Sequence, residues 1–198
     1  DSLDGLRLNL LRRMSHQELV LLLTHWLEDL NLPQPSGRML LELAGNIAKQ
    51  NRIDMAASEL EFREQGDVVY VLRPLPPMVF VSCPLGDFEF SGGRVSSNAI
   101  KGGALRASSD YTVAFRSGKE KIRIGKNRDI KNIFQESRVP SWLRDRIPLI
   151  YSGDELVAIA AVPDWQISMR VADGWAAGIE EEGFNVSLSL ADSVLRDC

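Results

Sequence analysis

Three closely spaced prolines, Pro74, Pro76 and Pro77, divide the chain into two parts with different hydrophobic periods. Proline fixes its own φ and has no amide hydrogen to donate, so neither a helix nor a central strand continues through such a cluster. Apolar residues recur at helical spacing before the prolines and in short β-like stretches after them. The cluster therefore predicts a hinge between a helical unit and a β-rich unit.

The part before the prolines is predicted to be mainly helical. Ser15 and Glu18 have the spacing of a capping box, in which each side chain accepts a hydrogen bond from the other residue's backbone N–H. Segment 31–36 contains two prolines, which end that helix before a second one begins. The residues expected to face the core are Leu3, Leu6, Leu10, Leu11, Leu19, Leu22, Leu23, Trp26, Leu27, Leu30, Leu40, Leu43, Ala44 and Ile47.

A β-hairpin is expected to close this first part, because ELEFRE at 59–64 and VVYVLR at 68–73 flank the turn residues Gln65-Gly66-Asp67. After the prolines the pattern predicts short strands around one helix, which Asp129 caps and whose inward face carries Ile130, Ile133 and Phe134. The expected strands are 78–82, 88–90, 94–97, 104–107, 111–115, 121–124, 155–162 and 183–190.

These patterns predict an α+β protein. A small α-rich domain closed by a β-hairpin is followed by a β-rich α/β domain with one main helix. The predicted bounds are 1–75 for the α-rich domain, 76–108 for a Pro/Gly-rich hinge with short strands, and 109–198 for the second domain. The absence of an initiator Met at Asp1 suggests a piece of something longer.

Charge is strongly segregated along the chain. Between Arg116 and Arg146 ten Lys and Arg residues face four acids, a local balance of +6, whereas the whole chain carries −4. The residues outside this basic window therefore sum to −10. Clustered cations attract phosphates and release their counterions, so the window favours a polyanion partner over a merely solvated surface.

The sequence in and after this window contains several motifs in a specific order. FQE at 134–136 is followed by VPSWLRDR at 139–146, by Pro148-Leu149 and by GDELVA at 153–158. This ordered set resembles the C-terminal substrate-binding domain of the tRNA(Ile)-lysidine synthetase family, and the α-rich part resembles the middle domain of that family. In one departure, Lys131-Asn132 stands where the family often has adjacent lysines.

The resemblance implies that the chain is the tRNA-binding C-terminal portion of an enzyme that ligates lysine to the wobble cytidine of tRNA(Ile) using ATP. It further implies that ATP and Mg are bound by an N-terminal domain outside this chain, so that the chain holds no cofactor and no catalytic residue. We expect tRNA(Ile) as partner, with no DNA and no membrane, and a homodimer is compatible with the resemblance. The expected tRNA-binding residues are Lys119, Lys121, Arg123, Lys126, Arg128, Lys131, Arg138, Arg144 and Arg146.

Other site types find little support in the sequence. SGGRVS at 91–96 echoes a pyrophosphate-binding loop, but Val95 stands where that loop has Asp and no helix is expected after it, so a hairpin turn is favoured. His16 and His25 both lie in the first long helix, without a nucleophile elbow anywhere in the chain. Asp154 and Glu155 are neighbours in a turn, where they point in different directions rather than forming a catalytic pair. No metal site is predicted.

The compartment is predicted to be the cytoplasm. No apolar run approaches the roughly 18 residues that span a bilayer, and the first residues are too polar for a secretory signal. Cys83 and Cys198 are expected to be reduced thiols. Two other functions stay open: a protein-interaction module that docks an acidic partner, and an editing-type domain related to the phenylalanyl-tRNA synthetase β chain.

Overall fold

The computed structural model describes residues 5–57, 59–74, 77–78, 82–91, 93–102, 104–108 and 110–190. The described residues divide into two compact units, with the boundary between positions 75 and 76. Both units contain antiparallel sheets, and four α-helices lie in the described residues. The predicted α+β class is therefore confirmed.

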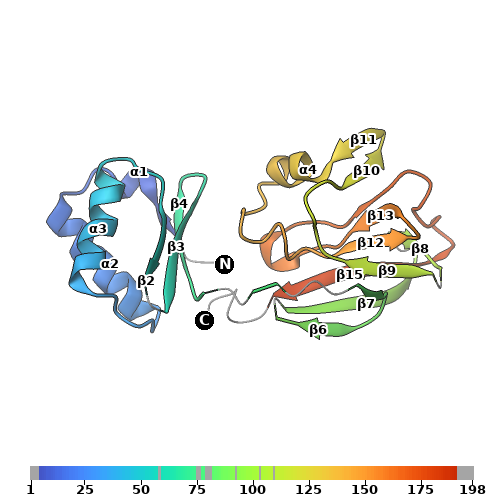
Figure 1. The fold of residues 1–198 in the computed structure, drawn as a ribbon, viewed down its shortest axis with the longest axis horizontal. Helices are drawn as coiled ribbons and strands as arrows, with labels where there is room; N and C mark the ends of the chain where they lie inside the picture. Colours follow the sequence, from blue (N-terminus) through green and yellow to red (C-terminus); the bar gives the residue numbers. More distant parts are fainter. Residues whose placement is uncertain are drawn as a thin grey trace. The chain divides into compact units, whose positions relative to one another are not determined.

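The first unit is a four-stranded antiparallel sheet with helices on one face (Figure 1). The sheet has the order β1-β4-β3-β2, so the first strand pairs with the last. Its elements are β1 (Leu6–Arg7), α1 (Leu8–Leu11), α2 (His16–Asp29), α3 (Gly37–Ala48), β2 (Asp54–Ala57), β3 (Leu60–Gln65) and β4 (Val68–Leu72).

Short-range sequence signals account for the helix starts and the hairpin of this unit. The capping box is present at the start of α2, where Ser15 and Glu18 exchange hydrogen bonds, and the side chain of Ser36 caps α3 by accepting one hydrogen bond from the amide of Met39. The predicted hairpin is confirmed as β3–β4, with Gly66 at a positive φ in its turn. The residues buried between helices and sheet include Leu19, Leu23, Leu27, Leu43, Ile47, Phe62 and Val69.

The predicted apolar stripe ahead of the capping box is wrong. Leu6 lies in β1, where it pairs with Val69, and Leu10 is exposed, while Leu8 and Leu11 are buried. Leu3 lies outside the described residues. Pairing with a strand distant in sequence overrides the helical spacing here, and only one helical turn remains.

The second unit is built mainly from strands. Its one α-helix among the described residues is α4 (Ile130–Glu136), and η1 (Pro163–Trp165) is a 3₁₀ turn. The strands are β5 (Cys83–Pro84), β6 (Phe88–Phe90), β7 (Gly93–Lys101), β8 (Leu105–Arg106), β9 (Tyr111–Ala114), β10 (Lys121–Ile124), β11 (Lys126–Asp129), β12 (Leu149–Ser152), β13 (Glu155–Ile159), β14 (Arg170–Val171) and β15 (Glu182–Leu190).

These strands form three sheets. A five-stranded sheet has the order β14-β13-β12-β9-β5, a four-stranded sheet has the order β6-β7-β15-β8, and β10 and β11 form a separate hairpin. Ala161, just after β13, hydrogen-bonds the backbone of Val186 and Leu188 in β15, which joins the two larger sheets. Figure 1 shows the hairpin and α4 beside the five-stranded sheet, away from β6 and β7.

The sequence predicted several of these strands closely, including β6, β10 and β15. The inward face of α4 is also confirmed, since Ile130, Ile133 and Phe134 are buried. Asp129 stands at the helix N-cap, but its side chain makes no capping hydrogen bond. The expected strand 78–82 falls largely outside the described residues.

Candidate functional site

The β10–β11 hairpin displays basic side chains on a fixed backbone. Lys121 pairs with Asp129 and Arg123 with Asn127, while the alternate residue Ile122 is buried. Because successive side chains of a strand point to opposite faces, burial of Ile122 turns Lys121 and Arg123 toward solvent.

The turn of this hairpin is held by the loop that follows β14. The amide of Gly125 donates to a carboxylate oxygen of Asp173 at 2.8 Å, and the amide of Asp173 donates to the carbonyl of Arg123 at 2.8 Å. Gly125 has a φ of 68°, a conformation that favours glycine. These bonds fix the position from which the neighbouring cations project.

Five of the nine expected tRNA-binding residues are exposed and make no ion pair within the described ranges. Three of them lie in the hairpin strands, one precedes the hairpin, and one lies in the first turn of α4. They are Lys119, Lys121, Arg123, Lys126 and Lys131. Arg138 is also exposed, but it interacts within the protein, and it follows α4 in a left-handed conformation with a φ of 54°.

The remaining three expected residues are engaged within the protein. Arg128 forms an ion pair with Glu136 on α4. The Nε of Arg144 donates to the carbonyl oxygen of Val139 at 3.0 Å. Arg146 is only 5% exposed and lies 3.5 Å from the sulfur of Met78. These three side chains therefore have partners within the protein, whereas the five exposed ones make no ion pair, although all belong to the same basic window.

The VPSWLRDR segment is largely a structural corner. Val139, Trp142 and Leu143 are buried, and the ring of Trp142 meets Trp165 edge-on with centroids 6.2 Å apart. Asp145 accepts a hydrogen bond from Arg116 at 3.1 Å, which ties the corner to the end of β9. Burial, together with the nearby Arg116 charge, lowers the pKa of Arg144.

One cation outside the window joins this region. Arg170, in β14, lines a small cavity of about 180 Å³ together with Arg128, Glu136 and Ser137. Arg170 is exposed and has no ion-pair partner in the part of the chain that the structure describes. A linear charge count could not detect it, because only the pairing of β14 with β13 brings it to this place.

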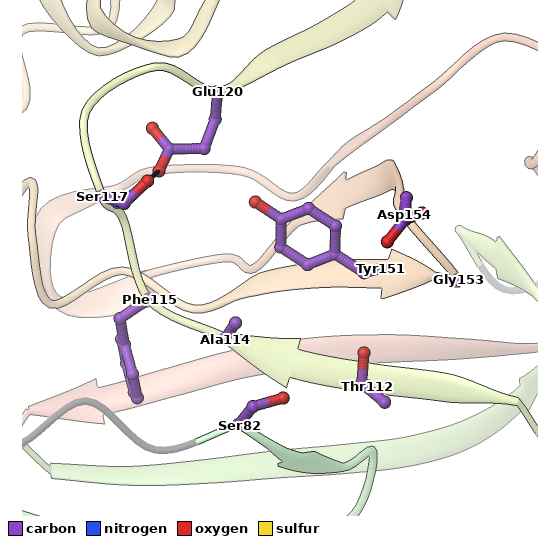
Figure 2. Close-up of a pocket in the computed structure, with 9 residues that line it drawn as sticks. All are labelled: Ser82, Thr112, Ala114, Phe115, Ser117, Glu120, Tyr151, Gly153 and Asp154. Carbon is purple, nitrogen blue, oxygen red and sulfur yellow. Dashed lines mark hydrogen bonds between the residues drawn. The ribbon is translucent and has the colours of Figure 1, made fainter.

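A second hollow of about 250 Å³ lies beside β9 and β12 (Figure 2). Figure 2 shows the ring of Tyr151 at its centre, with Glu120 and Ser117 on the side of its hydroxyl and Asp154 on the other side. The lining residues are Ser82, Thr112, Ala114, Phe115, Ser117, Glu120, Tyr151, Gly153 and Asp154.

Glu120 is the best-anchored side chain of this pocket. Its carboxylate accepts hydrogen bonds from the hydroxyl of Ser117 at 2.8 Å, from the amide of Gly118 at 3.0 Å and from the amide of Ser117. The Nε of Arg116 lies 3.8 Å away. Burial acts to raise the pKa of Glu120, but the hydrogen bonds outweigh it, so that the pKa lies below its usual value.

The other ionisable groups of the pocket have different surroundings. Burial, and then the charge of Glu120, raises the pKa of Tyr151, so its phenol is neutral at physiological pH. Asp154 is exposed and makes no hydrogen bond or ion pair with any described residue. Glu155, in contrast, accepts a hydrogen bond from the indole of Trp175 at 3.4 Å. The two neighbouring carboxylates thus have separate surroundings, as the sequence predicted.

The alternative sites considered from the sequence are not supported by the described geometry. Phe90 pairs with Gly93 and the strand β7 follows, which confirms a hairpin turn for the SGGRVS segment. His16 contacts the carbonyl of Leu41 and His25 contacts Glu28, both at the surface. No group of three or more His, Cys, Asp or Glu side chains suited to a metal ion occurs in the described residues.

Cys83 is a free thiol whose pKa is raised by burial, and Cys198 lies outside the described residues. Among the residues that the structure covers, no helix has the length and apolar character to cross a membrane.

The chain is similar to proteins of the tRNA(Ile)-lysidine synthase family. Residues 111–184 match the family model described as the TilS substrate C-terminal domain. A tRNA(Ile)-lysidine synthase of Legionella pneumophila (strain Paris) is 24% identical over 190 residues, covering 87% of this chain and 43% of that protein. One from Coxiella burnetii is 32% identical over 102 residues, covering 48% of this chain and 21% of that protein. The chain thus spans less than half the length of these relatives.

Proposed function

The chain belongs to the tRNA(Ile)-lysidine synthase family as its C-terminal part, and we propose that its second unit holds the tRNA substrate through the exposed cations of the β10–β11 hairpin and α4. The observation that carries this proposal is the outward display of Lys121, Arg123 and Lys126 on a hairpin whose turn is anchored to Asp173. The anchored hairpin backbone sets where these side chains begin, so only the side chains themselves have to be ordered when phosphates bind.

The charge arrangement fits RNA of duplex form. A-form helices expose phosphates and 2′-hydroxyls, and proteins recognise them mainly by shape rather than by reading base edges in the deep major groove. Lys119, Lys121 and Lys126 lie within a few residues of one another along the hairpin, and Lys131 follows on α4. This surface sets the register of a bound tRNA without specifying its bases.

For the complete protein, we propose the ligation of lysine to the wobble cytidine of tRNA(Ile) with ATP. ATP and Mg would be bound outside this chain, and the first unit would help to position the tRNA. The residues of this chain would bind and orient the RNA. Holding the tRNA in a fixed orientation makes the reaction at the wobble cytidine effectively unimolecular.

The test compares two double substitutions that remove the same charge from the second unit. Lys121→Gln with Lys126→Gln removes two exposed hairpin cations, whereas Arg94→Gln with Lys101→Gln removes two cations of β7 that pair with Asp87 and Glu180. Binding of a tRNA(Ile) transcript is measured by fluorescence anisotropy at several salt concentrations, with circular dichroism of each variant as a folding control.

We expect the hairpin variant to bind more weakly and to flatten the log–log salt dependence by roughly 1.4 to 1.8, because each lost phosphate contact removes about 0.7 to 0.9. The β7 variant should keep the slope of the unaltered protein. Equal slopes in all three proteins would refute the assignment of this surface. Retained tRNA binding together with loss of an acidic protein partner would favour the protein-interaction alternative.

A further inference from the structure

The described side chains that line the pocket around Tyr151 include carboxylates and hydroxyls but no cation, and the nearby Arg116 lies 3.8 Å from the carboxylate of Glu120. Glu120 and Asp154 contribute carboxylates, and Ser82, Thr112 and Tyr151 contribute hydroxyls. No Lys or Arg is among the described residues that line it. A phosphate would be repelled from such a hollow, whereas a group rich in N–H donors would be attracted to it.

The position of this pocket links it to the basic surface. Glu120 lies between Lys119 and Lys121 in the chain, and the backbone of Glu120 accepts a hydrogen bond from Ile130 at the start of α4. An RNA strand whose phosphates are held by these lysines therefore has its nucleosides within reach of an acceptor-lined hollow. The local charge changes sign within one residue, so the two places select different chemical groups of the same ligand.

The size of the pocket restricts the occupant to one small group. Its volume of about 250 Å³ is below the range of roughly 300 to 1,000 Å³ typical of drug-sized ligands. The partly exposed Tyr151 ring stands at its centre and provides an aromatic surface of the kind on which unstacked bases pack (Figure 2).

We propose that this pocket receives one unstacked nucleobase of a bound RNA, with the base packed on Tyr151 and its exocyclic amino group donating to the carboxylate of Asp154. The proposal rests on the function proposed above, because the lysines of the hairpin bring the RNA strand to the pocket. Asp154 is suited to this role because its carboxylate is not engaged by any described residue, whereas that of Glu120 already accepts bonds from Ser117 and Gly118.

The chemistry distinguishes bases that are similar in size. Cytosine carries an amino group at position 4, which donates to a carboxylate, whereas uracil carries a carbonyl oxygen there, which the carboxylate of Asp154 repels. The pocket is thus expected to select an amino-bearing base and to reject uracil. This selection would add base preference to a surface that otherwise reads only backbone shape.

The experiment uses the chain as it exists and two single-stranded probes, a pentamer of cytidylate and a pentamer of uridylate, each labelled for fluorescence anisotropy at low salt. The two probes carry the same phosphates and differ mainly at position 4 of the ring. We expect the cytidylate pentamer to bind about tenfold more tightly, the effect of roughly one charge-assisted hydrogen bond. The uridylate pentamer reports the phosphate contribution alone.

Asp154→Asn is the decisive variant, and Glu89→Gln is its control, since Glu89 is an exposed carboxylate of β6 that does not line the pocket. Both variants remove one negative charge, which by electrostatics alone strengthens binding to any RNA. If Asp154 accepts the amino group, Asp154→Asn instead weakens cytidylate binding and abolishes the preference, while Glu89→Gln preserves it.

The outcomes separate the two proposals. Equal affinity for the two pentamers, or stronger cytidylate binding by Asp154→Asn, overturns the base pocket while the salt-dependent binding of tRNA by the hairpin lysines stands. Absence of salt-dependent binding to tRNA and to both pentamers overturns the proposed function and the base pocket together. Circular dichroism of Asp154→Asn confirms that the fold is intact, so a lost preference reports the pocket.

Discussion

Arg146 and Lys121 belong to the same basic window, but their side chains have opposite surroundings. Lys121 is exposed on β10, whereas Arg146 is 5% exposed and is the one charged residue among the buried side chains of the described chain. A buried guanidinium cannot reach a phosphate on the surface, and its removal leaves its partners unsatisfied. The two residues are therefore expected to respond to substitution in different observables.

We predict that Arg146→Gln lowers the free energy of unfolding by about 1 to 3 kcal/mol, the usual cost of disrupting a buried polar group. The salt dependence of tRNA binding by the folded variant should equal that of the unaltered protein. Chemical denaturation and anisotropy titrations measure the two effects. A variant of normal stability with a flatter salt slope would show that Arg146 contacts the RNA.

The sequence indicates which cations are exposed on the hairpin, but not which cations are engaged by acids elsewhere in the fold. Alternation along 121–124 correctly indicates which side chains face solvent, because the strand period is local. The partners of Arg116 and Arg128 are Asp145 and Glu136, which come close only through the fold of the corner and of α4. From the sequence, Asp154 was considered only as half of a catalytic pair with Glu155, and that pair was rejected. The hollow beside Asp154 could not be predicted, because β9 and β12 form it together.

At the scale of elements, the loop between β9 and β10 depends on one carboxylate. Glu120 accepts hydrogen bonds from Ser117 and Gly118, and Arg116 lies nearby. The folded pKa of Glu120 is below its ordinary value, so the ionised form is favoured by folding. Its contribution to stability is complete above the ordinary value of about 4.5 and is lost as the pH falls through the lower folded pKa.

We therefore predict that Glu120→Gln reduces the pH dependence of stability below about pH 4.5. Thermal unfolding is followed from about pH 6 down to about pH 3, and the variant should lose less stability over this range than the unaltered protein. At neutral pH the variant should be the less stable of the two, because an amide accepts these bonds more weakly than a carboxylate. Parallel pH profiles would show that the carboxylate does not hold the loop.

The end of α3 provides a second prediction at this scale. Gln50 follows the helix in a left-handed conformation, with a φ of 57°, and the amide of Asn51 returns to the carbonyl of Asn46 at 2.9 Å. This is a Schellman-type ending, which normally places glycine at the left-handed residue. We expect Gln50→Gly to raise the free energy of unfolding by about 0.5 to 1 kcal/mol, and Lys49→Gly, at a right-handed position, to lower it. Equal effects would contradict this account.

Elements with local signals were predictable, whereas the pairing of segments far apart in the chain was not. The capping box of α2 and the β3–β4 hairpin depend on residues a few positions apart. The strand β1 and the nine-residue pairing of β7 with β15 depend on segments far apart in the chain. For this reason the helical spacing of Leu6 and Leu10 was misleading, whereas that of the residues in α2 was sound.

At the scale of the whole molecule, charge is distributed unevenly between the basic window and the rest of the chain. The net charge is −4, but the basic window carries +6, so the rest of the protein repels RNA while this window attracts it. The balance of +6 already includes Glu136 and Asp145, but the fold engages Arg116 with Asp145, Arg128 with Glu136, and Arg144 with the carbonyl of Val139. Only part of the cationic charge seen in the sequence is available to phosphates.

The salt dependence of tRNA binding should reveal this engagement. If all nine expected residues contacted phosphates, the log–log slope would be about −6 to −8, whereas the five exposed lysine and arginine residues without ion pairs give about −3.5 to −4.5. We predict the shallower slope, measured by anisotropy between about 50 and 300 mM salt with a tRNA(Ile) transcript. Glu136→Gln should steepen it by close to one contact, because release of Arg128 from its ion pair exposes one more cation beside Arg170. A slope near −8, unchanged by Glu136→Gln, would mean that Arg128, Arg144 and Arg146 leave their intramolecular partners when the RNA binds.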